Sequence, residues 1–182
     1  CDDNDSASTI VATDADCDGS LTADDCDDSD ATIYPEAGDT YDDGVDSDCD
    51  LLDCEAATVG SAYLVFCPDE KGTWSDAETT CVSAGYDGLA SILSLAEQTA
   101  MNSMMAATLL ETSERPWIGL ESSDWATWTD GNAVSYDNWA SNEPNGGTSG
   151  FCGHMNRDAD GTGTWNDVPC GDTDWSLWCS SR

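Results

Sequence analysis

Basic side chains are nearly absent from the chain. Four Lys and Arg residues stand against 38 Asp and Glu residues, which gives a formal net charge of −34. A surface of this sign repels the phosphates of nucleic acids and the headgroups of anionic membranes. No apolar run is long enough to cross a bilayer. We therefore expect neither nucleic-acid binding nor membrane insertion.

Histidine occurs once, as His154, and no two cysteines form a C-x-x-C pair. These absences exclude a zinc site built from Cys and His. No Ser or Cys nucleophile has a His partner in a motif, no phosphate-binding glycine loop occurs, and no spacing selects a catalytic acid pair. We expect a binding or structural protein and no enzyme, with His154 an ordinary strand or loop residue.

Cysteine, in contrast, is abundant, with ten residues in a chain of 182. Without a zinc site, disulfides are the better explanation, and they form in oxidising compartments. The first residue is a Cys and no signal peptide is visible, which suggests a mature or trimmed product. We therefore expect a secreted, extracellular or cell-surface protein.

The acids are unevenly distributed along the chain. Residues 1–53 contain 19 acids and no base, whereas residues 54–182 contain the other 19 acids and all four bases. We expect two parts, an acidic arm (1–53) and a globular domain (54–182). So much negative charge opposes compaction, so the chain is halophilic, or bound cations neutralise part of the charge, or both.

One segment of the arm, residues 14–25, fits the twelve-residue calcium loop of helix-loop-helix proteins. Acids stand at its first, third, fifth and last positions, Gly19 allows the sharp turn at the sixth, and Leu21 is the apolar eighth residue. An Asp ends the loop where a full site has Glu, and no helical pattern flanks it, so we expect a bare loop. Its candidate calcium ligands are Asp14, Asp16, Asp18, Ser20 and Asp25.

The rest of the arm repeats the alternating acids without a glycine at the sixth place. Residues 14–53 resemble metal-binding repeats of large bacterial surface proteins and, more loosely, thrombospondin type 3 repeats. The resemblance implies calcium held in a disulfide-pinned coil with little core. Its further candidate ligands are Asp28, Asp30, Asp46, Asp48 and Asp50. Because Tyr41 stands where such repeats often carry Cys, the implied bridges are Cys26–Cys49 and Cys1–Cys17.

The globular part shows strand and helix patterns in turn. Residues 62–67 predict a buried strand. A helix is expected from Thr73, an N-cap paired with Asp76, to Gly85. Residues 89–92 predict a short strand, residues 95–105 a second helix with three methionines packed inward, and residues 117–120 another strand.

Two later runs, Glu-Pro-Asn at 143–145 and Trp-Asn-Asp at 165–167, bracket a loop that Cys152 and Cys170 can close. Calcium takes carboxylate and amide oxygens together, so the two runs predict another cation site. Its candidate ligands are Glu143, Asn145, Asn166 and Asp167.

These motifs, taken in order, resemble the C-type lectin domain over about residues 54–182. The resemblance implies an α+β fold with two helices, two small antiparallel sheets and a long loop region. It places Trp117, Trp165 and Trp178 in the core, so that Trp125 and Trp128, in a polar loop, are the candidates for exposed contacts. The implied disulfides are Cys81–Cys179, Cys152–Cys170 and Cys54–Cys67, although Ala62 stands where the family usually places the second Cys of the last pair.

In that family the four candidate ligands also hold the sugar, and a cis Pro144 shapes their loop. Glu-Pro-Asn resembles the version that prefers mannose-type glycans, because the donor and acceptor order selects the hydroxyl geometry. A fifth ligand, an acid two residues before the loop Cys, is replaced by Gly150. The implied site is weaker for that loss, with Asp158 or Asp160 as substitutes.

Two functions therefore remain open. The first is a secreted, calcium-stabilised lectin that binds glycans through the loop from Glu143 to Asp167. The second is a structural subunit of an extracellular fibre or surface layer, whose calcium-ordered arm docks on neighbouring copies.

Overall fold

The structure is a computed structural model that describes residues 13–40, 43–52, 54–107, 115–123, 125–147, 149–156 and 163–182. Internal contacts divide it into two compact units, Cys1–Ala56 and Ala57–Arg182, and each is described by itself. Among the described helices, none is long and apolar enough to span a membrane.

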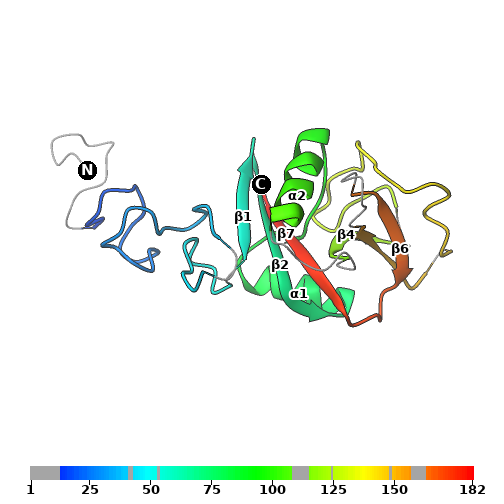
Figure 1. Cartoon of the computed structure of the whole chain (residues 1–182), viewed down its shortest axis with the longest axis horizontal. Coiled ribbons are helices and arrows are strands. Elements are labelled where there is room, and N and C mark those ends of the chain that lie inside the picture. The colour runs from blue at the N-terminus through cyan, green and yellow to red at the C-terminus, as the bar shows by residue number, and fades with distance from the viewer. Residues whose placement is uncertain are drawn as a thin grey trace. The chain divides into compact units, whose positions relative to one another are not determined.

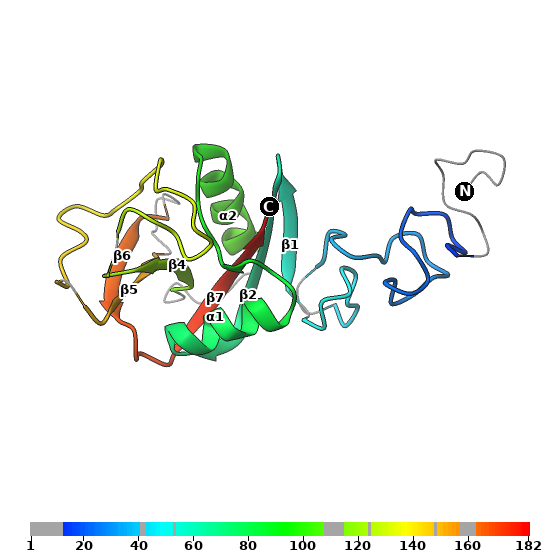
Figure 2. The same ribbon diagram turned by 180° about the vertical axis from the view of Figure 1, so that it is seen from behind.

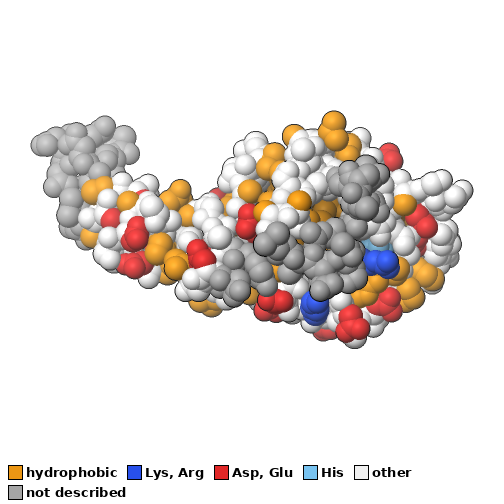
Figure 3. Space-filling model, viewed as in Figure 1, with side chains coloured by type: hydrophobic (Ala, Val, Ile, Leu, Met, Phe, Trp, Pro, Cys, Tyr) orange, Lys and Arg blue, Asp and Glu red, His pale blue; other side chains and the backbone are white. Residues whose placement is uncertain are grey.

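The acidic arm is made of turns and bends, without helix or strand in its described residues 13–40 and 43–52. The buried side chains of these residues are one alanine, Ala37, and three carboxylates, Asp14, Asp39 and Asp48. On the face seen in Figure 3, acidic side chains of the arm alternate with apolar ones. The arm is therefore organised around buried acids and has no hydrophobic core of its own in the part described.

The second unit is built on one sheet of seven strands, in the order β1-β2-β7-β4-β5-β6, with β3 paired to β7. β7 runs beside β2 in Figure 1. The two small antiparallel sheets that were expected are joined into one mixed sheet, because β4 pairs with β7 in parallel at Trp117 and Leu177. The strands are β1 (Glu55–Val59), β2 (Ala62–Gly72), β3 (Gly88–Leu89), β4 (Trp117–Glu121), β5 (Phe151–Met155), β6 (Trp165–Pro169) and β7 (Trp175–Ser181).

Two helices pack against this sheet, α1 (Trp74–Ser83) and α2 (Leu95–Ala107). The predicted capping box of α1 is confirmed, since Thr73 and Asp76 exchange hydrogen bonds at its N-terminus. The hydrogen bond from the Thr73 hydroxyl lowers the pKa of Asp76. α1 contacts β2, β3 and β7, and Figure 2 shows it lying across β2 and β7 from behind.

The strand predicted for residues 89–92 is shorter than expected, because β3 ends at Leu89. The N–H of Ala90 still donates to Trp178 O at 2.7 Å. The next N–H, that of Ser91, donates instead to the hydroxyl of Ser180. A side chain therefore replaces the ladder partner at this point, and the strand ends there.

The hydrophobic core lies between the sheet and α2. All three methionines of α2 are buried in it, as predicted, together with Trp165 and Trp178. Trp117 is also fully buried, as predicted, but it packs outside this cluster, with its ring 4.9 Å from that of Trp175. The prediction that Trp128 is exposed is wrong, because its side chain is 2% exposed and its ring meets that of Trp165 at a centroid distance of 5.4 Å. Trp125 is half-buried against the core.

A short turn explains why the loop brings Trp128 inward. The N–H of Trp128 donates to Asn132 O at 2.9 Å, and the N–H of Thr129 donates to Gly119 O of β4 at 3.0 Å. The backbone of this polar loop is thus tied to the sheet. Burying a large indole then stabilises the fold more than exposing it to a ligand would.

Each unit contains disulfides of its own. Cys26 is bonded to Cys49 in the arm, Cys81 of α1 to Cys179 of β7, and Cys152 of β5 to Cys170 after β6. These three pairs are those that the resemblances imply. Three further cysteines, Cys17, Cys54 and Cys67, are also disulfide-bonded. Cys1, the expected partner of Cys17, lies outside the described residues.

Candidate metal-binding sites

The loop site of the second unit is organised by Asp167. This residue lies on β6 and its side chain is 6% exposed. Its Oδ1 accepts a hydrogen bond from the N–H of Asn145 and its Oδ2 accepts one from the N–H of Gly146, both at 2.8 Å. The Glu143–Pro144 bond is cis. One carboxylate therefore holds the backbone of the Glu-Pro-Asn loop against β6.

Glu143 faces the same carboxylate. Burial raises the pKa of Glu143, and the neighbouring Asp167 raises it further. Its Oε2 is buried and accepts no hydrogen bond from the described residues. Two adjacent carboxylates, one with an oxygen that no donor reaches, fit a divalent cation. Asn166, next to Asp167 on β6, uses its Oδ1 to accept the Asp167 N–H at 2.9 Å.

Gly146 is a residue of this site that sequence reasoning missed. A Cβ on it would collide with the Asp167 carboxylate and the Phe151 ring. Only glycine lets the loop come this close to β6 without displacing a candidate ligand. The signal was present in the sequence, since Gly146 directly follows Glu-Pro-Asn, but glycines are also frequent in ordinary turns.

Gly150 stands where the resembled family places a fifth ligand. It is exposed, with a φ of +79°, and its carbonyl accepts the Cys170 N–H at 3.1 Å. The position thus serves the turn that closes the Cys152–Cys170 loop. The proposed substitutes, Asp158 and Asp160, lie outside the described residues.

The first loop of the arm gathers more acids than its own sequence supplies. Two overlapping groups each have carboxylate oxygens within 4.8 Å of one another, and both include Asp16. Asp14 is fully buried and accepts hydrogen bonds from the N–H groups of Cys17 and Gly19. The two groups are Asp14, Asp16 and Asp28, and Asp16, Asp18 and Asp25.

The second of these groups shows the mark of a cation site. The Oδ2 atoms of Asp16, Asp18 and Asp25 are buried and accept no hydrogen bond from the described residues. Burial raises the pKa of Asp16, and the charges of Asp18, Asp25 and Asp14 raise it further. Water does not screen these oxygens and no donor neutralises them, so a cation suits the space between them. The predicted ligand Ser20 contributes an N–H to Asp18 Oδ1 at 2.6 Å.

Asp28 and Asp30 stand two positions apart in the predicted second stretch, but their side chains have different surroundings in the structure. Asp28 turns back to the first loop, where it accepts hydrogen bonds from the Ala15 N–H at 2.7 Å and the Thr22 hydroxyl at 2.6 Å. Asp30 is exposed and accepts hydrogen bonds from Thr32, which lower its pKa. The structure does not bring Asp30 to any group of candidate ligands among the described residues.

A separate group of acids, later in the arm, consists of Asp46, Asp48 and Asp50, whose carboxylate oxygens also lie within 4.8 Å of one another. Asp39, which sequence reasoning missed, supports the same turn. Its side chain is 4% exposed and accepts the N–H groups of Ser47 at 3.1 Å and Cys54 at 3.2 Å. Burial raises the pKa of Asp39, against the effect of these hydrogen bonds. Its isolated position between Gly and Thr had given no motif to find it by.

Comparison with known families and proteins identifies the second unit. The family model described as "Lectin C-type domain" matches residues 70–177, and the chain belongs to this family. The acidic arm lies outside the matched residues. The matched residues include both helices, the strands β3 to β6 and the candidate loop site.

Individual relatives agree with this assignment. The chain is 34% identical over 119 residues to an alpha-N-acetylgalactosamine-specific lectin of Patiria pectinifera, covering 61% of this chain and 68% of that one. It superposes on human lithostathine with a TM-score of 0.60 at 27% identity, covering 70% of this chain and 96% of that one. It also matches a carbohydrate-recognition domain of cow CD23, at 26% identity and a TM-score of 0.55, over 69% and 91% of the two chains.

Proposed function

We propose that this protein is a secreted, non-enzymatic lectin that binds glycans through calcium held by Glu143, Asn145, Asn166 and Asp167. The observation that carries the proposal is the facing pair of carboxylates, in which Glu143 Oε2 is buried without a donor among the described residues. The Asp167 hydrogen bonds hold Asn145 and Gly146 in place beside them. The ligand set is therefore organised before any ion arrives, which lowers the cost of binding.

Calcium bound there would accept two vicinal sugar hydroxyls as further oxygen ligands. Glu143 would accept a hydrogen bond from one hydroxyl and Asn145 would donate one to the other, so that their order selects the sugar. The Glu-Pro-Asn order supports mannose-type glycans. Support for a sugar ligand in general comes from the relatives, one named a GalNAc-specific lectin and one solved in the presence of GlcNAc2Man3 oligosaccharide.

We further propose that the arm binds calcium at two places and is ordered by it. Buried carboxylate oxygens without donors among the described residues support the site at Asp16, Asp18 and Asp25. The group at Asp46, Asp48 and Asp50 supports a second site. In this function the arm is an extension of the chain that bound cations stiffen.

The test is calcium titration calorimetry followed by a glycan array, with the full chain and the double variant Glu143→Gln, Asn145→Asp. We expect the wild type to bind mannose-type glycans only with calcium, and the variant to lose them or to prefer galactose-type glycans. Asn142→Asp is the matched control, since it adds the same charge as Asn145→Asp at an exposed residue of the same loop that is not a candidate ligand. Calcium-independent glycan binding by the wild type would contradict the proposal.

The alternative of a fibre or surface-layer subunit stays a prediction that the comparisons do not support. Sedimentation of the purified protein with calcium and without sugar separates it from the lectin. Assembly that disappears in the double variant, together with no bound glycan on the array, would favour the fibre.

A further inference from the structure

The arm contains the same five-residue pattern twice, Asp-x-Asp-Cys-Asp, at residues 14–18 and 46–50. The structure gives both copies similar turns. The first Asp of each accepts two backbone N–H groups from later residues, Asp14 from Cys17 and Gly19, and Asp46 from Asp50 and Leu51. Each copy therefore wraps its backbone around its first carboxylate, and in each copy the second acid, Asp16 or Asp48, lies in one group with the first.

The cysteine in each copy adopts a left-handed backbone. The φ angle is +73° at Cys17 and +60° at Cys49. Side chains other than Gly, Asn and Asp rarely adopt this region. Both cysteines are disulfide-bonded. A turn that its own residue disfavours needs an outside constraint, and at Cys49 that constraint is the bond to Cys26.

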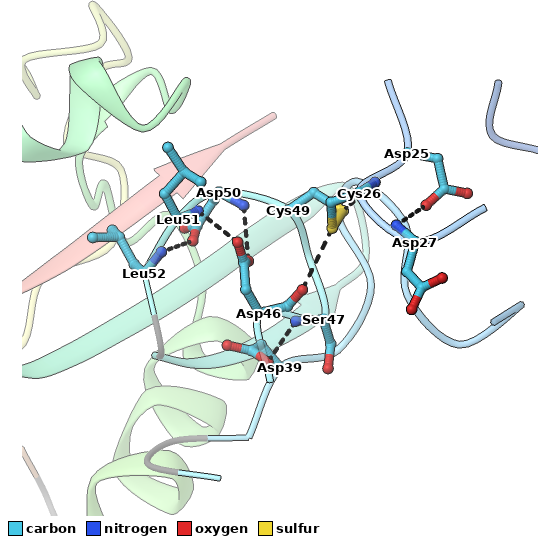
Figure 4. Close-up of a disulfide and its surroundings, with 10 residues drawn as sticks. All are labelled: Asp25, Cys26, Asp27, Asp39, Asp46, Ser47, Cys49, Asp50, Leu51 and Leu52. Carbon is cyan, nitrogen blue, oxygen red and sulfur yellow. Dashed lines mark hydrogen bonds between the residues drawn. A yellow bond between two sulfur atoms is a disulfide. The ribbon is translucent and has the colours of Figure 1, made fainter. Parts of the chain in front are cut away.

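The Cys26–Cys49 disulfide lies between Asp25, of the group Asp16, Asp18 and Asp25, and Asp46, of the group Asp46, Asp48 and Asp50 (Figure 4). Cys26 directly follows Asp25 of the first group, and Cys49 stands between Asp48 and Asp50 of the second. A carboxylate oxygen of Asp25 lies within 4.8 Å of both sulfurs. On the other side, Cys26 Sγ lies 3.6 Å from the Asp46 carbonyl oxygen. The bond thus touches one ligand residue of each group.

This disulfide is also more accessible than the two of the lectin unit. Cys26 is exposed and Cys49 half-buried, whereas Cys81 and Cys179 are both fully buried and Cys152 is fully buried beside a half-buried Cys170. A thiolate must reach a sulfur to break the bond, so access determines which disulfide is reduced first.

We propose that Cys26–Cys49 is a redox-sensitive link that couples the two calcium sites of the arm. The inference rests on the proposed function, in which both groups bind calcium. A dithiol reductant breaks the link: one thiolate attacks a protein sulfur, the S–S bond cleaves, and the second thiolate releases the other cysteine. Two electrons and two protons pass to Cys26 and Cys49, and the reductant leaves as a cyclic disulfide.

Reduction then frees Cys49 from its left-handed turn and Asp25 from its position beside the sulfurs. Both groups lose their fixed geometry together, and calcium affinity falls at both. Linkage makes the effect reciprocal, so calcium must protect the disulfide from reduction by the factor that reduction weakens calcium.

The test compares oxidised wild type with the double variant Cys26→Ser, Cys49→Ser in the full chain, by calcium titration calorimetry. We expect the arm sites of the variant to bind calcium at least about tenfold more weakly, within the usual range of coupled sites. A tryptophan fluorescence spectrum equal to that of the wild type shows that the lectin unit is folded, because every Trp of the chain, from Trp74 on, lies in that unit. Because Cys17 is exposed too, the serine variant, and not reduction alone, assigns the effect.

Coupling itself is measured by a second variant, Asp48→Asn, made with and without the disulfide. With the disulfide present, Asp48→Asn weakens calcium binding at its own group and also at the group Asp16, Asp18 and Asp25. Without the disulfide, calcium binding at Asp16, Asp18 and Asp25 is unaffected. In parallel, alkylation with mass spectrometry after dithiothreitol treatment should label Cys26 and Cys49 less when calcium is present. Equal labelling with and without calcium, or equal calcium affinity in the serine variant, overturns the proposal. Oxidised wild type without calcium at the arm instead overturns the proposed function.

Discussion

The two units of this chain use opposite means to keep a backbone in place. The lectin unit buries large apolar side chains such as Trp128 and Trp178 behind a continuous sheet. The arm buries Asp14, Asp39 and Asp48, and holds its turns by hydrogen bonds from backbone N–H groups to carboxylates. A hydrophobic core is stable without help, whereas a core of acids depends on counter-charge. The comparison predicts that each unit fails under a different treatment.

The largest effect is expected from cutting into the hydrophobic core. Trp128→Ala should lower the free energy of unfolding of the lectin unit by about 3–5 kcal/mol, because it leaves a large cavity beside Trp165. Denaturant unfolding followed by tryptophan fluorescence measures this unit alone. The control, Leu95→Ala on the exposed face of α2, should change stability by less than about 0.5 kcal/mol. Similar values for both variants would mean that Trp128 is not a core residue.

Calcium removal should instead act on the arm. At calcium concentrations of about 100 times the dissociation constant, the bound arm gains about 2.7 kcal/mol, so chelation should speed its cleavage by an Asp-specific protease about 100-fold. Trypsin cannot report this, because residues 1–53 contain no Lys or Arg. Cleavage at the same rate with and without calcium would show that carboxylate hydrogen bonds suffice to order the arm.

The lectin unit also contains a buried polar cluster. Variants in it test whether this unit depends on apolar packing alone. Arg182 donates two hydrogen bonds to the Glu97 carboxylate, at 2.9 and 3.2 Å, and another to the Ser91 carbonyl. Arg182→Met should destabilise this unit by about 2 kcal/mol, because it leaves the largely buried Glu97 carboxylate without its counter-charge. Arg115→Met, at an exposed residue 5.8 Å from the Trp175 ring, should cost at most about 1 kcal/mol. Chemical denaturation of both variants decides whether this pair matters.

The smallest expected effect is on the pH dependence of calcium binding. The raised pKa values of Asp16 and Glu143 mean that the folded protein takes up protons above their usual 3.8 and 4.5. In calcium-free protein this proton uptake stabilises the fold as pH falls through the raised pKa values. Calcium binds the charged forms, so its affinity should fall in the same window, by up to tenfold per pH unit for each proton released.

Titration calorimetry from pH 7 to pH 4 checks this dependence. Asp30→Asn is the control, because the pKa of Asp30 is lowered by Thr32 and the residue stands outside the candidate groups. An affinity that stays constant down to the ordinary range of Asp would contradict the role assigned to these carboxylates.

Much of the lectin unit could be predicted because its signals lie in consecutive residues. The capping box at Thr73 and Asp76, the packed face of α2 and the strand at residues 117–120 depend on local geometry. The order of these motifs along the chain is also sufficient to indicate the family. The strand predicted at residues 89–92 is too long, because the Ser91 N–H donates to a side chain instead of to the backbone of a neighbouring strand.

The arm shows the limit of the same reasoning. Alternating acids predict that ligands exist, and the turn at Gly19 follows from local sequence. Which acids meet is a long-range outcome, since Asp28 returns to Ala15 and Thr22 while Asp30 does not. Charge spacing says nothing about such returns, because every carboxylate of the arm is a comparable acceptor.

By itself, the sequence determined the class of protein, the division of charge between arm and globular domain, and the ligand types at the candidate sites. These depend on composition and on neighbours along the chain. Only the tertiary structure decided that Trp128 is buried, that Gly146 admits the loop to Asp167, and that Cys26–Cys49 lies between two acid groups. Each of these depends on a contact between residues far apart in sequence, where packing outweighs local preference.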